Sequence, residues 1–168
     1  MNSDMRESGS EQMPEFSESY SDLLCSDLTV TEQRSLIFQV LYAVDAFDYE
    51  VSLESIVDNL SRGFGVIIPQ DSTVFKTALA VSSERAVLDV QITPLIENWR
   101  FDRLGVATKL ILRFAVWELQ HSSTDAAVII NEAVELAKCF AEKDAYKFIN
   151  GILDEFLKSR GIEKDSVS

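Results

Sequence analysis

Apolar side chains recur at helical spacing along most of the chain, and this periodicity restricts the fold more than any other feature. The first set falls at i, i+1, i+4, i+5, i+8 and i+11, which is one face of a helix: Leu36, Ile37, Val40, Leu41, Val44 and Phe47. Thr29 or Thr31 can cap the start of this helix. A second, shorter stripe of the same kind consists of Leu53, Ile56, Val57 and Leu60.

Caps and breakers separate the helices that follow. Asp71 or Ser72 can cap a third helix, and Pro94 lies inside a later apolar run, where it predicts a kink or a helix restart because it removes a backbone donor. Gly105 precedes a further helix. Gly161 ends the last helix, as a glycine just beyond a helix C-terminus commonly does.

The sequence predicts an all-α fold of six or seven helices joined by short loops, arranged as two packed helical bundles. Residues 66–68 (VII) form a β-like triplet, but they lie between Gly and Pro breakers without an alternating partner, so we interpret them as a loop. The predicted helical domain spans residues 29–160, with subdomains at about 29–98 and 99–160. Residues 161–168 form a short tail.

Residues 1–28 differ from the rest in composition. They contain seven acidic residues, a single basic residue and few apolar anchors. Such a segment cannot bury enough apolar surface to fold by itself, and we expect a disordered acidic arm. A short docked helix around residues 16–24 is the alternative.

The chain lacks the patterns that most enzyme and metal sites need. It has a single histidine, two cysteines, no HExxH or CxxC motif and no phosphate loop ending in GK[ST]. We therefore expect no enzyme activity, no metal and no cofactor. No apolar run approaches the ~18 residues of a membrane helix. The first residues form no secretory signal, so a soluble, cytoplasmic protein is expected.

The net charge of −13 argues against casual nucleic-acid binding, but the charge is unevenly distributed. Residues 1–98 hold 5 basic and 17 acidic side chains, whereas residues 99–168 hold 10 and 11. The cations are thus concentrated in the second half, where residues 143–148 (KDAYKF) place two lysines beside aromatic rings.

Five segments of the chain carry the patterns of a known protein family. INEAVELAKCF (130–140) followed by KFINGILD (147–154) resembles the C-terminal signature of the NusB family of transcription antitermination factors. LGVATKLILRFAVWEL (104–119), VLDVQITPLIENW (87–99) and RSLIFQVLYAVD (34–45) resemble its earlier segments, so the similarity covers about residues 34–158. The resemblance implies two helical bundles and no enzyme activity.

The resemblance also implies a function. Members of the family bind boxA, a short single-stranded RNA element of ribosomal RNA transcripts. They bind it together with NusE, which is also a protein of the small ribosomal subunit, and the complex is delivered to RNA polymerase. Some relatives self-associate, so a homodimer is a further state to consider.

The resemblance places one RNA contact at the start of the last helix, which here holds Lys143, Asp144, Lys147 and Phe148. Lysines neutralise phosphates, and an aromatic ring can stack on an unpaired base, worth ~1–3 kcal/mol. Asp144 would accept hydrogen bonds from base or sugar donors, or repel phosphate. The alternatives are core packing for Phe148 and a solvated face for the lysines.

The second implied RNA contact lies at the start of the first helix, where the family commonly has several arginines. This chain has VTEQ at residues 30–33, so only Arg34 remains. The loss of phosphate contacts predicts weaker RNA binding. It motivates an alternative function, a NusB-like protein–protein adaptor that binds NusE with little RNA affinity of its own.

Two residues are candidates for contact with a protein partner. Tyr42 lies in the segment that resembles the partner-facing part of the first helix, with a core tyrosine as the alternative. Arg113 is the second candidate, with an ion pair to Glu118 or Glu84 as the alternative.

Overall fold

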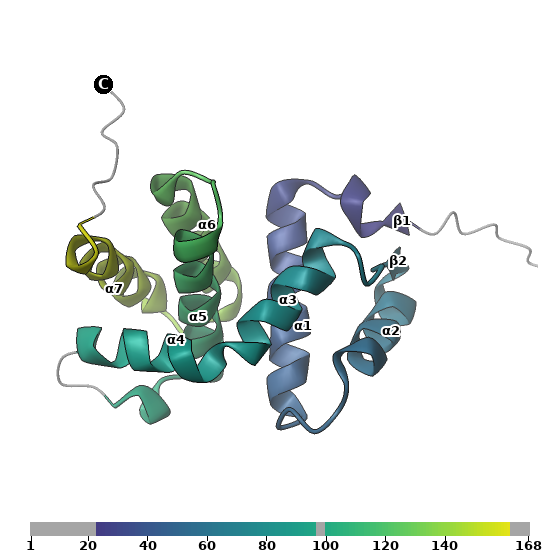
Figure 1. The fold of residues 1–168 in the computed structure, drawn as a ribbon, viewed down its shortest axis with the longest axis horizontal. Helices are drawn as coiled ribbons and strands as arrows, with labels where there is room; N and C mark the ends of the chain where they lie inside the picture. Colours follow the sequence, from purple (N-terminus) through teal and green to yellow (C-terminus); the bar gives the residue numbers. More distant parts are fainter. Residues whose placement is uncertain (1–22, 97–99, 162–168) are drawn as a thin grey trace, which may run out of the picture.

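The computed structural model describes residues 23–96 and 100–161, and within them the chain is mainly helical (Figure 1). The elements in chain order are β1 (Leu23–Leu24), η1 (Cys25–Asp27), α1 (Val30–Ala46), α2 (Leu53–Phe64), β2 (Val66–Ile67), α3 (Thr73–Ser83), α4 (Arg85–Ile92), η2 (Thr93–Leu95), η3 (Phe101–Arg103), α5 (Val106–His121), α6 (Ala126–Phe140) and α7 (Ala145–Ser159). The prediction of an all-α fold is confirmed. No helix in the described part is long and apolar enough to cross a membrane.

The helices form two neighbouring groups. Figure 1 shows α1, α2 and α3 with the two strands on one side, and α4 to α7 on the other. Helix α5 packs against α6 and α7 and also against α1 and α4, so a single cluster of buried apolar residues extends through both groups. The division into subdomains at 98/99 stays a prediction, but the structure places α4 beside α5.

Local hydrogen bonds fix where the helices begin. The hydroxyl of Thr29 accepts a hydrogen bond from the Glu32 N–H, and the Thr29 N–H donates to the Glu32 carboxylate, which forms a capping box at α1. The bond from the Thr29 backbone lowers the pKa of Glu32 below its ordinary value. Ser72 caps α3 in a similar way, and Asp125 caps α6. Both caps expected from the sequence at residues 29 and 72 are therefore present.

The predicted helix ends also agree with the structure. Helix α4 ends at Ile92, and the next residues, including Pro94, form the 3-10 helix η2, which is the interruption that the proline predicts. Gly161 follows the end of α7 with a positive φ of 64°, a left-handed conformation that costs glycine little. Residues 97–99, at the end of the predicted apolar run, lie outside the described residues.

Two predictions about the N-terminal half are wrong. Residues 66–67 are not a loop but the strand β2, which pairs in parallel with β1, so that Leu23 lies opposite Val66. The arm does not extend to residue 28, because Cys25 is only 1% exposed and belongs to the core. The rest of the arm, and most of the alternative helix at 16–24, lies outside the described residues.

Replacement of Thr29 by alanine is expected to lower the free energy of unfolding by about 1 kcal/mol, because the Glu32 N–H loses the hydroxyl that accepts its hydrogen bond. Urea denaturation followed by circular dichroism measures this change. Thr29→Ser keeps the hydroxyl and serves as the control, with a stability within a few tenths of a kcal/mol of the wild type. Equal losses for both variants would contradict a role for the cap.

Candidate nucleic-acid interface

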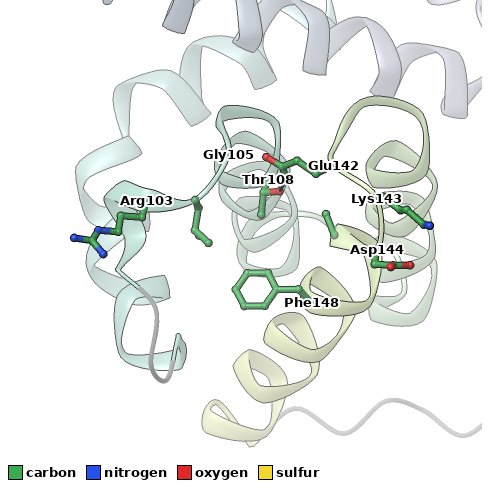
Figure 2. Close-up of a pocket in the computed structure, with 9 residues that line it drawn as sticks. Arg103, Gly105, Thr108, Glu142, Lys143, Asp144 and Phe148 are labelled. Atoms are coloured by element: carbon green, nitrogen blue, oxygen red, sulfur yellow. Dashed lines mark hydrogen bonds between the residues drawn. The ribbon is translucent and has the colours of Figure 1, made fainter.

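The start of α7 is set by a tight turn that follows α6. Helix α6 ends at Phe140, and Asp144 precedes α7 with a positive φ of 66°. Aspartate tolerates this left-handed conformation better than most residues other than glycine. The turn directs the side chains of Lys143 and Asp144 outward, as Figure 2 shows, and both are exposed.

A hollow of about 320 Å³ lies between this turn and the start of α5 (Figure 2). Its lining comes from η3 with the residues that follow it, and from the α6–α7 turn with the first residues of α7: Arg103, Leu104, Gly105, Thr108, Glu142, Lys143, Asp144, Ala145 and Phe148. The ring of Phe148 points into the hollow, while Arg103 and Lys143 extend away from it on opposite sides. The hollow thus has an apolar centre with a cation on each side.

A carboxylate closes one end of the hollow. Glu142 extends toward α5, where the Thr108 hydroxyl donates a hydrogen bond of 3.3 Å to its Oε2 atom. A Cβ atom at Gly105 would lie 1.7 Å from Oε1 of Glu142, so the glycine makes room for this approach. The negative charge also lies near the N-terminus of α5, where the helix dipole stabilises it.

The structure brings together four predicted RNA-contacting residues, Lys143, Asp144, Lys147 and Phe148. The Lys147 ammonium lies 3.7 Å from the Asp144 carboxylate, but both side chains are more than half exposed, so this ion pair is weak and readily exchanged. Phe148 is half-buried, lines the hollow and also packs against the core. Phe148 therefore packs against the core and also lines the hollow.

Arg34 is engaged inside the protein. Its Nε and Nη2 atoms donate to the two carboxylate oxygens of Glu118 at 3.2 and 2.8 Å, and the two side chains are 7% and 11% exposed. This placement does not fit the predicted phosphate contact, because the ion pair would have to open first. The cause is long-range: Glu118 lies 84 residues away, and no local pattern signals the pairing.

Arg113 is also held within the chain. Its guanidinium donates to both oxygens of Asp89 at 2.6 and 2.8 Å and to the Tyr49 hydroxyl at 3.2 Å. Burial alone would lower the pKa of Arg113, but the hydrogen bonds and charge of Asp89 raise it above its ordinary value. The alternative pairing with Glu118 or Glu84 is wrong, and a guanidinium committed to Asp89 does not fit the predicted partner contact.

Tyr42 lies on the surface, so the alternative of a core tyrosine is wrong. Its side chain is 48% exposed and lines a groove of about 440 Å³ with Phe38, Gln39, Ala43, Leu60 and Phe140. The rings of Phe38 and Phe140 stack with centroids 4.7 Å apart. Exposed apolar grooves of this kind are common at protein interfaces, and the predicted role of Tyr42 stays a prediction.

Three polar lining residues of the hollow were not singled out from the sequence: Arg103, Thr108 and Glu142. They lie on separate segments that meet only in the folded chain, and no local pattern in the sequence marks them as site residues. The only signal for Glu142 in the sequence is that it is charged and directly precedes the cluster at 143–148. In the part of the chain that the structure describes, no group of His, Cys, Asp or Glu is arranged to hold a metal ion.

The chain is similar to known proteins of one family. The model of the NusB family matches residues 31–158. The transcription antitermination protein NusB of Macrococcus caseolyticus is 36% identical over 132 residues, which cover 77% of this chain and 97% of the relative. The NusB protein of Staphylococcus aureus (strain bovine RF122) is 34% identical over 127 residues, with 76% and 97% covered.

Solved structures show the same fold. NusB of T. maritima matches with a TM-score of 0.66 and 25% identity, over 78% of this chain and 92% of that one. A structure of the antitermination factors NusB and NusE in complex with dsRNA matches with a TM-score of 0.66 and 23% identity, over 77% and 96%. The second likeness concerns the fold alone.

Replacement of Arg34 by methionine is expected to lower the free energy of unfolding by about 3–5 kcal/mol, because Glu118 is left as an unpaired buried charge. The double variant Arg34→Met/Glu118→Leu should recover most of this loss. Urea denaturation measures both. The control is Arg62→Met, which removes an exposed ion pair with Asp58 and should cost at most about 1 kcal/mol. A loss at Arg34 as small as that of the control would contradict the buried ion pair.

Proposed function

This chain belongs to the NusB family, and we propose that it binds boxA-type single-stranded RNA of ribosomal RNA transcripts together with NusE and delivers the complex to RNA polymerase. As a member of this family it is a transcription antitermination factor, which is an RNA-binding regulatory protein and not an enzyme. The hollow at the start of α7 is the observation that carries the proposal. Action on nascent transcripts places the protein in the cytoplasm.

The hollow suits an unpaired nucleotide. Phe148 offers an aromatic ring in an apolar centre, where an unpaired base can stack. Lys143 and Lys147 are exposed beside it and can neutralise phosphates. Single-stranded RNA provides splayed bases of this kind, whereas bases in a duplex are stacked inside the helix. Asp144, at the edge of the hollow, can accept from a base or sugar donor.

The groove beside Tyr42 supports the choice of a protein partner. It is apolar and aromatic, and it lies next to the end of α6, just before the turn that borders the hollow. NusE is the partner in the structural neighbour solved with dsRNA, and we propose that NusE occupies this groove. A homodimer that covers the hollow would compete with RNA.

A second function is favoured by one specific observation at the start of α1. Residues 30–33 carry no cation, and Arg34 is paired with Glu118 in the interior. The chain would then be an adaptor that binds NusE and has little RNA affinity of its own. RNA affinity measured without and with NusE separates these two functions.

The double variant Lys143→Ala/Lys147→Ala is expected to weaken RNA binding and to flatten its salt dependence. Each lost phosphate contact should reduce the slope of log K against log salt by about 0.7 for a single strand. Fluorescence anisotropy with a labelled boxA-type RNA, with NusE present and at several salt concentrations, measures the slope. Lys158→Ala, an exposed lysine near the far end of α7, is the control. An unchanged slope in the double variant would remove these lysines from the RNA site.

Replacement of Tyr42 by alanine is expected to weaken the complex with NusE by about 1–3 kcal/mol, because the groove loses an aromatic anchor. Isothermal titration calorimetry measures the affinity. Val90→Ala removes another exposed apolar side chain, on α4, and should leave it unchanged. If NusE binds both variants and the wild type equally, the groove is not the partner site. A stable NusE complex that binds no RNA would favour the adaptor.

A further inference from the structure

We propose that Glu142 selects the base that occupies the hollow, favouring bases with an exposed amino group over uracil. The inference rests on the proposed RNA-binding function and assigns a specificity-determining role to a residue that the sequence analysis did not single out.

The charges make the hollow better suited to a base than to a phosphate. Its lining holds two cations, Arg103 and Lys143, and two carboxylates, Glu142 and Asp144. The cations extend outward on opposite sides, whereas Glu142 reaches across one end (Figure 2). A phosphate inside the hollow would meet the negative charge of Glu142. A neutral base placed there would leave its flanking phosphates near the two cations.

Glu142 is exposed, and two contacts orient its carboxylate across the end of the hollow. Thr108, which is 3% exposed, donates a hydrogen bond of 3.3 Å to Oε2 of Glu142. The other oxygen, Oε1, lies against Gly105, where a Cβ atom could not fit without displacing it. An ionised carboxylate only accepts hydrogen bonds and has about four acceptor positions, of which the Thr108 hydroxyl uses one.

A carboxylate acceptor at this place discriminates between the bases by their donors. Cytosine, adenine and guanine each present an exocyclic amino group, and carboxylates commonly accept from the amino group of cytosine. Uracil presents carbonyl oxygens at its edge, which a carboxylate repels, and its single N–H lies between them. Stacking on Phe148 tolerates any base, so the preference would come from Glu142.

The experiment is a competition assay on the complex of the full chain with NusE. A labelled boxA-type RNA is displaced by unlabelled RNAs in which each position in turn carries each of the four bases. At one position, uracil is expected to bind on the order of 10-fold more weakly than the preferred amino-bearing base, the strength of one hydrogen bond to a charged group. In Glu142→Gln the amide both donates and accepts, so this difference should fall to about 2-fold or less.

Two further variants are measured. The first is a control, and the second tests the contact from Thr108. Glu135→Gln makes the same change in charge on the exposed face of α6, outside the hollow, and should keep the wild-type preference. Thr108→Val removes the hydroxyl that positions the carboxylate while keeping the volume of the side chain. It should weaken the preference in the same direction as Glu142→Gln. Circular dichroism confirms that each variant is folded.

The outcomes separate this inference from the function on which it rests. Equal preferences in the wild type and Glu142→Gln would overturn the role of Glu142 and leave RNA binding intact. A uniform rise in affinity for all RNAs, with unchanged preference, would also overturn it, because Glu142 would then act only as a repelling charge. If the wild-type complex with NusE binds none of the RNAs, the proposed function fails and the inference fails with it.

Discussion

The central position of α5 is the constraint on which the remaining structure depends. Its apolar side chains are buried against α1, α4, α6 and α7, and three of its polar side chains bond to other elements of the protein. Each partner belongs to a different element: Thr108 contacts the α6–α7 turn, Arg113 bonds to Asp89 of α4, and Glu118 pairs with α1. Through these contacts, α5 is connected to helices of both groups.

The same constraint bears on the RNA site proposed at the start of α7. Arg34, at the start of α1, is paired with Glu118 and buried, so this cation does not lie on the surface. The start of α5 and the turn before α7 are instead left open around a hollow with two exposed lysines nearby. This agrees with the concentration of basic residues after position 98. A protein with net charge −13 can thus present a locally favourable surface to a polyanion.

The parts of the fold that depend on neighbouring residues could be predicted from the sequence, and those that depend on distant residues could not. Helical periodicity and the caps at Thr29 and Ser72 located helices correctly, because both signals act over a few residues. The pairing of β1 with β2 joins segments about forty residues apart, and two-residue strands are too short to show alternation. At the candidate site, the cluster at 143–148 was visible in the sequence, whereas Arg103, Thr108 and Glu142 were not, because only the tertiary structure brings them together.

The contact between Gly105 and Glu142 links two positions that lie far apart in the sequence but share one small space. Any side chain at 105 would push the carboxylate outward, and a smaller residue at 142 would free that space. The two positions are therefore expected to change together among relatives, while the surrounding helices stay as they are. In this way a family with a fixed scaffold could alter the RNA it prefers through substitutions at two sites on its surface.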